Sequence, residues 1–218
     1  MKKWITTWAL ALVAGLVCNT GQAADGKKAI KLFNGKDLKN WTQQKPRAWE
    51  VKGGVLGPSA SPGGYIWAKE QFDNFELELE FKMSKRCNSG VFFRTDPRNA
   101  VQGGFEIQIL DSYGKAKVGK HDCGALYDAL APSSNPTKPA GEWNHMKLTV
   151  NGASVKVALN GKQVVDSDLD QWTKARKNPD GTRNKFRTAL KDLPRTGSIG
   201  LQYHGHPVWF KNIALKPL

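Results

Sequence analysis

The sequence of 218 residues carries 33 Lys and Arg against 19 Asp and Glu, a formal net charge of +14. This length fits a leader followed by one domain that is large enough to bury its own core. The positive charge favours anionic partners, but no nucleic-acid-binding motif accompanies it, so nucleic acid is excluded as the expected partner.

Residues 1–24 predict a cleaved signal peptide. A positively charged start, Lys2–Lys3, precedes an apolar run over residues 4–17 and then small residues that suit a signal peptidase. The run is shorter than the roughly 20 residues that span a bilayer. We therefore expect an exported domain over residues 25–218, periplasmic or extracellular, with no transmembrane segment after processing. A lipoprotein anchor at Cys18 is the less favoured alternative, because a valine precedes that cysteine.

Short strand-like segments, bounded by Gly, Asn, Pro or Asp, recur along the rest of the chain. Residues 75–82 alternate apolar and charged side chains, which is typical of an antiparallel strand with one buried face. Asn151-Gly152 and Asn160-Gly161 favour type I′ hairpin turns. Since helical periodicity is weak nearly everywhere, the sequence predicts an all-β jelly-roll sandwich of two antiparallel sheets. The predicted strands cover residues 49–52, 55–56, 65–67, 75–82, 91–94, 105–110, 145–150, 154–159, 163–165, 198–203 and 208–215.

Two long segments interrupt this rhythm, residues 111–142 and residues 167–197. Loops of this length inside a compact domain are usually functional or disordered. The second segment holds much of the excess positive charge, and a solvated basic loop is the plain interpretation of it. Cys87 and Cys123 remain after processing, and their spacing leaves open whether they form a disulfide or stay two buried thiols.

The predicted strand 105–110 carries the first candidate site. Its alternation places the apolar residues on one face and Glu106 with Gln108 on the other, with Asp111 at the strand end. Arg94 ends the preceding strand, and we expect a bent sheet to bring it beside Glu106. A carboxylate, an amide and a guanidinium on one face would bind the paired hydroxyls of a sugar. The alternative is an ordinary solvated sheet face.

Two further positions attract attention. Gln202 and His204 alternate onto one face of a strand end, although a histidine there is more often a surface residue than a catalyst. Trp172 lies in the basic segment and either stacks against a sugar ring or fills the core. No zinc-binding spacing, nucleophile elbow, phosphate loop or metalloprotease motif is present, so no metal site is predicted.

Ordered motifs run over essentially the whole mature chain. They are Leu32–Trp41, Asn88–Arg94, Gly104–Asp111, Gly124–Tyr127, Gly141–Asn144, Asn178–Gly181, Gly197–Gly205 and Val208–Ile213. Together they resemble the 3-keto-disaccharide hydrolases, a family also called domain of unknown function 1080. The resemblance implies a concanavalin A-like lectin/glucanase jelly roll.

The resemblance also implies a reaction, the cleavage of a glycoside whose sugar has been oxidised to a ketone at C3. The ketone acidifies the C2 proton, so that a base can remove it, the C1 glycosidic bond can leave by elimination, and water can add to the enone. This route needs one base, a stabiliser for the enolate oxygen, and an acid or metal for the leaving group. Ordinary glycoside hydrolysis would need two carboxylates at a set separation.

Within that chemistry we assign Glu106 as the base. Arg94, His204 or Lys211 would stabilise the enolate or protonate the leaving oxygen. The residues expected to bind sugar hydroxyls or rings are Gln108, Asp111, Tyr127, Asn88, Trp172 and Gln202. No particular cofactor is predicted, and a divalent cation such as calcium on Glu106 or Asp111 is an open alternative. The partner is a 3-keto sugar, and an oxidoreductase acting at C3 of the sugar must supply it.

Two other classes of function fit the same sequence. This fold hosts lectins as readily as enzymes, so a carbohydrate-binding module without catalysis is the main alternative. An interaction domain that grips acidic polysaccharide through the basic segment is the other, and its binding would depend strongly on salt.

Overall fold

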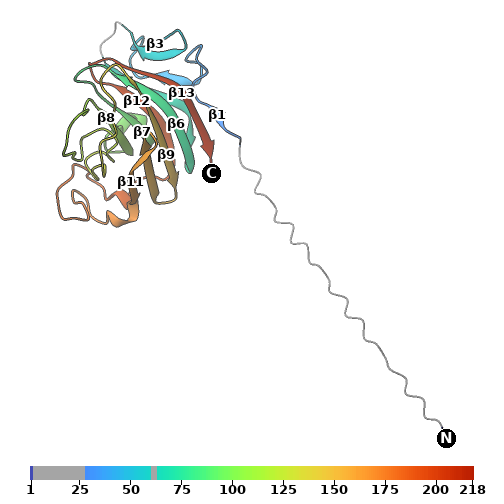
Figure 1. Cartoon of the computed structure of the whole chain (residues 1–218), viewed down its shortest axis with the longest axis vertical. Coiled ribbons are helices and arrows are strands. Elements are labelled where there is room, and N and C mark those ends of the chain that lie inside the picture. The colour runs from blue at the N-terminus through green and yellow to red at the C-terminus, as the bar shows by residue number, and fades with distance from the viewer. Residues whose placement is uncertain (2–27, 60–62) are drawn as a thin grey trace.

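The computed structural model describes residues 28–59 and 63–218 together with Met1. The predicted leader, apart from Met1, and its Cys18 lie outside the described residues. The described strands are β1 Ile30–Lys31, β2 Trp41–Gln43, β3 Trp49–Lys52, β4 Val55–Pro58, β5 Gly64–Phe72, β6 Phe75–Met83, β7 Asn88–Thr95, β8 Phe105–Leu110, β9 Trp143–Asn151, β10 Ser154–Leu159, β11 Lys162–Asp168, β12 Gly197–Tyr203 and β13 Val208–Pro217 (Figure 1). Three short 3-10 helices join them, η1 Pro97–Asn99, η2 Leu169–Gln171 and η3 Leu190–Asp192.

The strands form two antiparallel sheets, which confirms the predicted all-β sandwich. The larger sheet has eight strands in the order β11-β10-β9-β6-β13-β4-β3, with β1 beside β13. The smaller has five strands in the order β2-β5-β12-β7-β8. Their inner faces share one hydrophobic core, in which the Phe75 ring of β6 lies 6.5 Å from the Phe93 ring of β7.

Strand β6 shows how the sequence pattern builds this core. Its odd-numbered residues from Phe75 to Met83 are at most 1 % exposed, while its glutamates face outward. Full burial of each such apolar side chain contributes about 1.5–3 kcal/mol. On the outer face Lys147 of β9 lies 3.3 Å from a carboxylate oxygen of Glu76. The alternation therefore sets both the core face and the cross-strand charge pairs.

The hairpin turns agree with the sequence, with one correction. At Asn160-Gly161 both residues have positive φ, 50° and 80°, as a type I′ turn requires. The turn between β9 and β10 is different, because Asn151 is the last strand residue and pairs with Ser154. Its first central residue is Gly152, at φ 56°, so the φ pattern is that of type II′ and the predicted type I′ turn is wrong there.

Both long segments lie on the same side of the sandwich (Figure 1), one after β8 and one after β11. Cys87 and Cys123 are buried free thiols, the second of the two arrangements that the sequence left open. Within the described ranges the structure contains no helix that is long and apolar enough to cross a membrane.

Arg94 has a structural role that its sequence position conceals. Its side chain is fully buried and donates hydrogen bonds to the carbonyl oxygens of Asp73 (2.8 Å) and Gly152 (2.7 Å) and to the side-chain oxygen of Asn74 (3.0 Å). It thus fastens the β5–β6 turn to the β9–β10 turn. The expectation that it lies beside Glu106 is wrong, because a left-handed backbone at Arg94, with φ 49°, breaks the alternation of β7.

Replacing Arg94 by Met should therefore destabilise the fold. The variant removes three hydrogen bonds donated by a fully buried guanidinium, and we expect the free energy of unfolding in urea to fall by about 3 kcal/mol. The matched control is Lys211→Met, which removes a partly exposed ion pair to Glu80 and should cost about 1 kcal/mol or less. Equal effects of the two changes would contradict the assigned role of Arg94.

Candidate active site

The outer face of the five-stranded sheet carries the candidate site. In the register of β7 and β8, Glu106 lies opposite Phe92 and Gln108 lies opposite Gly90. Glu106 and Gln108 face away from the core, whereas Phe105, the first residue of β8, belongs to it. The predicted division of this strand into an apolar and a polar face is therefore confirmed. The polar face is covered rather than solvated, since Glu106 is 8 % and Gln108 2 % exposed.

Two glycines make room on this face. A Cβ atom at Gly90 would overlap the Oε1 atom of Glu106, so the carboxylate lies directly against the backbone of β7. In the same way a Cβ atom at Gly200 of β12 would overlap the indole ring of Trp67. Any larger residue at either position would displace the side chain above it. The glycines thus fix where the carboxylate and the indole can lie.

A segment of the first long loop pairs along the free edge of β8. The Gln108 N–H donates to the carbonyl of Ala125 (3.0 Å), and the Tyr127 N–H donates to the carbonyl of Glu106 (2.9 Å). Between them Leu126 forms an isolated antiparallel bridge with Ile107. This pairing extends the sheet by one short strand and places Tyr127 next to Glu106; its role in binding substrate stays a prediction.

Two residues that the sequence analysis missed surround Tyr127. The ammonium nitrogen of Lys185 lies 3.7 Å from the centroid of the Tyr127 ring, and the His121 ring lies 5.0 Å from it, centroid to centroid. Lys185 comes from the basic segment and His121 from the first long loop. Sequence offered only a weak signal for Lys185, one of eight basic residues between positions 174 and 195, and none for His121.

Burial sets the electrostatic state of Glu106. Its carboxylate accepts no hydrogen bond from the residues that the structure describes, and burial raises its pKa to about 7, while the nearby charge of Lys185 acts in the opposite direction. Both protonation states are therefore populated near neutral pH. A carboxyl group in this state can accept a proton from a substrate and return it, which is what a general base needs.

Beyond Glu106, the same face of the sheet carries amide and phenol groups. Gln108 donates to the side-chain oxygen of Asn88 (2.9 Å), and its own Oε1 atom is buried with no partner among the described residues. Gln202 donates to the Tyr65 hydroxyl (3.2 Å). Burial raises the pKa of Tyr65, and the carboxylate of Glu106 adds to this effect. Such groups offer donors and acceptors to hydroxyls without adding charge.

An open hollow of about 410 Å³ adjoins these amide and phenol groups. Its walls come from the segment after β2 and from the ends of β5 and β12. They are formed by Gln44, Lys45, Gly63, Gly64, Tyr65, Gln202, Tyr203, His204 and Gly205. His204 is exposed in this hollow. The predicted residues Gln202 and His204 thus lie together, beside the face that carries Glu106.

Three predicted residues lie elsewhere. Lys211 belongs to the other sheet, where it pairs with Glu80 (3.2 Å). Trp172 is only 3 % exposed, so the expectation that it stacks on a sugar is wrong and it fills the loop interior instead. Asp111 accepts the Arg86 N–H (2.8 Å) and lies five residues along the chain from Glu106, roughly 16 Å away for extended backbone.

Metal-ligating side chains do not gather in the part of the chain that the structure describes: no group of three His, Cys, Asp or Glu residues there could hold a metal ion. A divalent cation on Glu106 or Asp111 stays a prediction.

Residues 28–216 match the family model described as the 3-keto-alpha-glucoside-1,2-lyase-like domain. The chain belongs to this family. A 3-keto-disaccharide hydrolase of Bacteroides thetaiotaomicron is 31% identical over 233 residues, which span 89% of this chain and 79% of that protein. A crystal structure of a candidate glycosyl hydrolase from Parabacteroides distasonis superposes with a TM-score of 0.80 at 36% identity, covering 88% of this chain and 100% of the other.

These relatives support an enzyme of the glycosyl hydrolase type. More distant structures share the fold alone. A β-glucanase of Bacillus licheniformis superposes with a TM-score of 0.51 at 10% identity, covering 89% of this chain and 99% of the other. This likeness fits the concanavalin A-like jelly roll that the sequence motifs implied.

The buried carboxylate gives a testable effect on stability. Because the pKa of Glu106 in the folded protein, about 7, is above the usual 4.5, folding is favoured when the group is protonated. That stabilisation is complete below pH 4.5 and is lost as the pH rises through 7. Glu106→Gln removes the titration, so at pH 8 the variant should be more stable than the parent by up to about 3 kcal/mol.

Urea unfolding at pH 4.5 and pH 8 measures this effect. The control is the same change at the exposed Glu142, which should leave the difference between the two pH values as it is in the parent. A Glu106→Gln variant whose advantage does not grow with pH would show that the carboxyl is not buried as described.

Proposed function

We propose that this protein cleaves 3-keto-glycosides and that Glu106 removes the C2 proton of the substrate. The observation that carries the proposal is the buried carboxylate of Glu106, whose pKa no second carboxylate among the described residues shifts. Among the described residues, Lys185 is the only charged group that shifts the pKa of Glu106. Ordinary glycosidases use two carboxyl groups, about 5–5.5 Å apart or about 6.5–9.5 Å apart. A lone base of raised pKa instead suits proton abstraction next to a ketone.

The proposed reaction has two stages. Glu106 takes the C2 proton, and the electrons of that C–H bond move toward the C3 ketone to form an enolate. The enolate returns these electrons to form the C1–C2 double bond, the C1–O bond breaks, and the leaving oxygen takes up a proton. Water then adds at C1 while a proton returns to C2. The products are a 3-keto sugar and the released alcohol or sugar.

The arrangement of the face suggests how a substrate would lie. The oxidised ring would sit over the Glu106 carboxylate, which itself fills the space above Gly90, with Gln108 and Tyr127 at its hydroxyls. The leaving sugar would extend toward the hollow at Tyr65. From β8 to β5 the face crosses three strand spacings of about 4.8 Å each, which leaves room for two sugar rings.

His204 is the candidate acid for the leaving oxygen. It is exposed in the hollow that would receive the leaving sugar, and a histidine can give up a proton near neutral pH. Arg94 and Lys211, the other residues considered for this part of the reaction, are held in the contacts described above and face away from the site.

The cellular setting completes the proposal. A signal peptide at residues 1–24 would place the enzyme in the periplasm or outside the cell, where scavenged glycosides arrive. Because the substrate needs a ketone at C3, an oxidoreductase acting on that carbon of the sugar must precede this enzyme in the reaction sequence.

Incubation with 3-keto-trehalose or a 3-keto-glucoside tests the function. We expect the parent protein to release the free sugar and to leave unmodified trehalose intact. The rate constant kcat/KM should rise with pH through about 7 and then level, because the base acts in its deprotonated form. Glu106→Gln should lower kcat by about 10²–10⁴-fold with the fold intact.

Other outcomes would favour other functions. Cleavage of unmodified glycosides at a similar rate, or full activity of Glu106→Gln, would contradict the mechanism. Binding of unmodified oligosaccharides with no release of product from any 3-keto-glycoside would instead mark a carbohydrate-binding module.

A further inference from the structure

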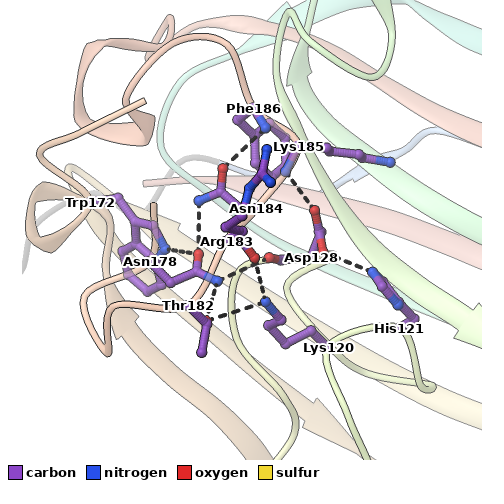
Figure 2. Close-up of polar contacts among 10 residues, drawn as sticks. All are labelled: Lys120, His121, Asp128, Trp172, Asn178, Thr182, Arg183, Asn184, Lys185 and Phe186. Carbon is purple, nitrogen blue, oxygen red and sulfur yellow. Dashed lines mark hydrogen bonds and ion pairs between the residues drawn. The ribbon is translucent and has the colours of Figure 1, made fainter. Parts of the chain in front are cut away.

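A buried polar network joins the two long loops beside the site (Figure 2). At its centre is Asp128, which is 9 % exposed and has a left-handed backbone with φ 58°. One carboxylate oxygen accepts the backbone N–H of Lys185 (2.7 Å), and the other lies 2.9 Å from Nε2 of His121. A single side chain of the first loop therefore holds the second loop at Lys185.

The network is anchored behind Asp128 by Asn178. The side-chain oxygen of Asn178 accepts hydrogen bonds from the Trp172 indole (2.9 Å) and from the Asn184 amide (2.8 Å). Its amide nitrogen donates to the carbonyl oxygen of Asp128 (3.4 Å). Asn178 is 3 % exposed, and buried, satisfied networks of this kind hold their members in one arrangement. Trp172 is thus part of the support and not of the sugar-binding face.

The network positions Lys185 but supplies no ion-pair partner for its ammonium group among the described residues. Both backbone groups of Lys185 are engaged, the N–H by Asp128 and the carbonyl oxygen by the side chain of Gln102 (3.1 Å). The side chain then extends over the Tyr127 ring. Among the described residues, no carboxylate forms an ion pair with it, whereas Lys115, in the other loop, pairs with Asp122 (2.7 Å).

The charge of Lys185 nevertheless lowers the pKa of Glu106, the proposed base. Lys185 and Glu106 do not form an ion pair, yet the lysine is close enough to act on the carboxyl group. Tyr127 contacts both residues. Its N–H donates to the carbonyl oxygen of Glu106, and the ammonium group of Lys185 lies over its ring. A reacting ring at Glu106 would therefore meet a cation on the side of Tyr127.

We propose that Lys185 is the catalytic residue that stabilises the enolate oxygen in this reaction, and that Asp128 is the positioning residue that holds it there. The inference rests on the proposed function. As Glu106 removes the C2 proton, negative charge develops on the oxygen at C3. The ammonium of Lys185 donates a hydrogen bond to that oxygen and keeps its own proton throughout, so no bond to the lysine forms or breaks. Pre-placed donors of this kind typically contribute about 10²–10³-fold to kcat.

Lys185→Met tests the catalytic role in a variant that keeps both backbone hydrogen bonds of residue 185. We expect kcat to fall by about 10²–10³-fold with little change in KM, and Lys185→Arg to recover part of the loss. The matched control is Lys174→Met, an exposed lysine of the same loop, which should keep full activity. Full activity of Lys185→Met would overturn the assignment.

The protonation of Glu106 gives a second readout that needs no substrate. The titratable groups around it are Lys185, Tyr65 and Tyr127, with His121 and Asp128 behind Tyr127. Loss of the lysine charge should raise the pKa of Glu106 above its present value of about 7, which NMR of the labelled carboxyl carbon can follow. An unchanged titration in Lys185→Met would show that the two groups are too far apart.

Asp128→Ala, which removes the side-chain acceptor of the Lys185 N–H, tests the positioning role. If Asp128 acts through Lys185, the variant should lower kcat and raise the pKa of Glu106 in the same direction as Lys185→Met. The double variant should be no slower than Lys185→Met alone. A loss of thermal stability with kcat and the Glu106 titration of the folded protein unchanged would make Asp128 a purely structural residue.

The proposed function and the role of Lys185 can be contradicted separately. If the parent protein releases product from 3-keto-glycosides but Lys185→Met is equally fast, only the inference on Lys185 is wrong. If the parent protein acts on no 3-keto-glycoside, the proposed function is wrong, and the Glu106 titration still decides whether the network places the lysine as described.

Discussion

The contact of the Glu106 carboxylate with the backbone of Gly90 determines the rest of the site. Only a glycine leaves the space that the carboxylate occupies, and Glu106 in that place is only 8 % exposed. Buried in this way, the carboxylate is removed from water and its pKa rises to about 7. Burial of this carboxylate lowers the stability of the folded protein at neutral and alkaline pH. The same burial gives the carboxylate a pKa at which it can exchange protons with a substrate, and active sites commonly combine these two effects.

The β-sandwich provides the surface on which the site lies, but the fold alone does not determine the reaction. Lectin-like modules and glucanases share the fold, and the difference lies in what is added to the outer face of the smaller sheet. Here two loops meet at Asp128 and bring Tyr127 and Lys185 to one edge of that face. The net charge of the chain is therefore a poor guide to its partner, because the lysine that matters acts locally, on one carboxyl group.

Sequence patterns predicted the parts that depend on local periodicity. The alternation of residues 75–82 and 105–110 gave the strands, their buried faces and the position of Glu106. It misplaced Arg94, because one left-handed residue ends the alternation and local sequence does not reveal it. It also missed Lys185, whose place depends on a hydrogen bond between two loops, 57 residues apart in the chain, and His121, which contacts Asp128 seven residues away within one irregular loop. Contacts of either kind follow from the folded topology and carry no signature in spacing.

The central claim is that cleavage begins with loss of the C2 proton to Glu106, and its most direct test is the reaction in D₂O. The C2 position of the released 3-keto sugar is read by NMR at early times, with the free product incubated alone to measure its own exchange. The account predicts that the first product formed carries deuterium at C2 and that Glu106→Gln forms none of it. Product that keeps its original proton at C2, formed at the same rate when C2 of the substrate carries deuterium, would contradict the account; retention alone would not, because Glu106 can return the proton that it removed.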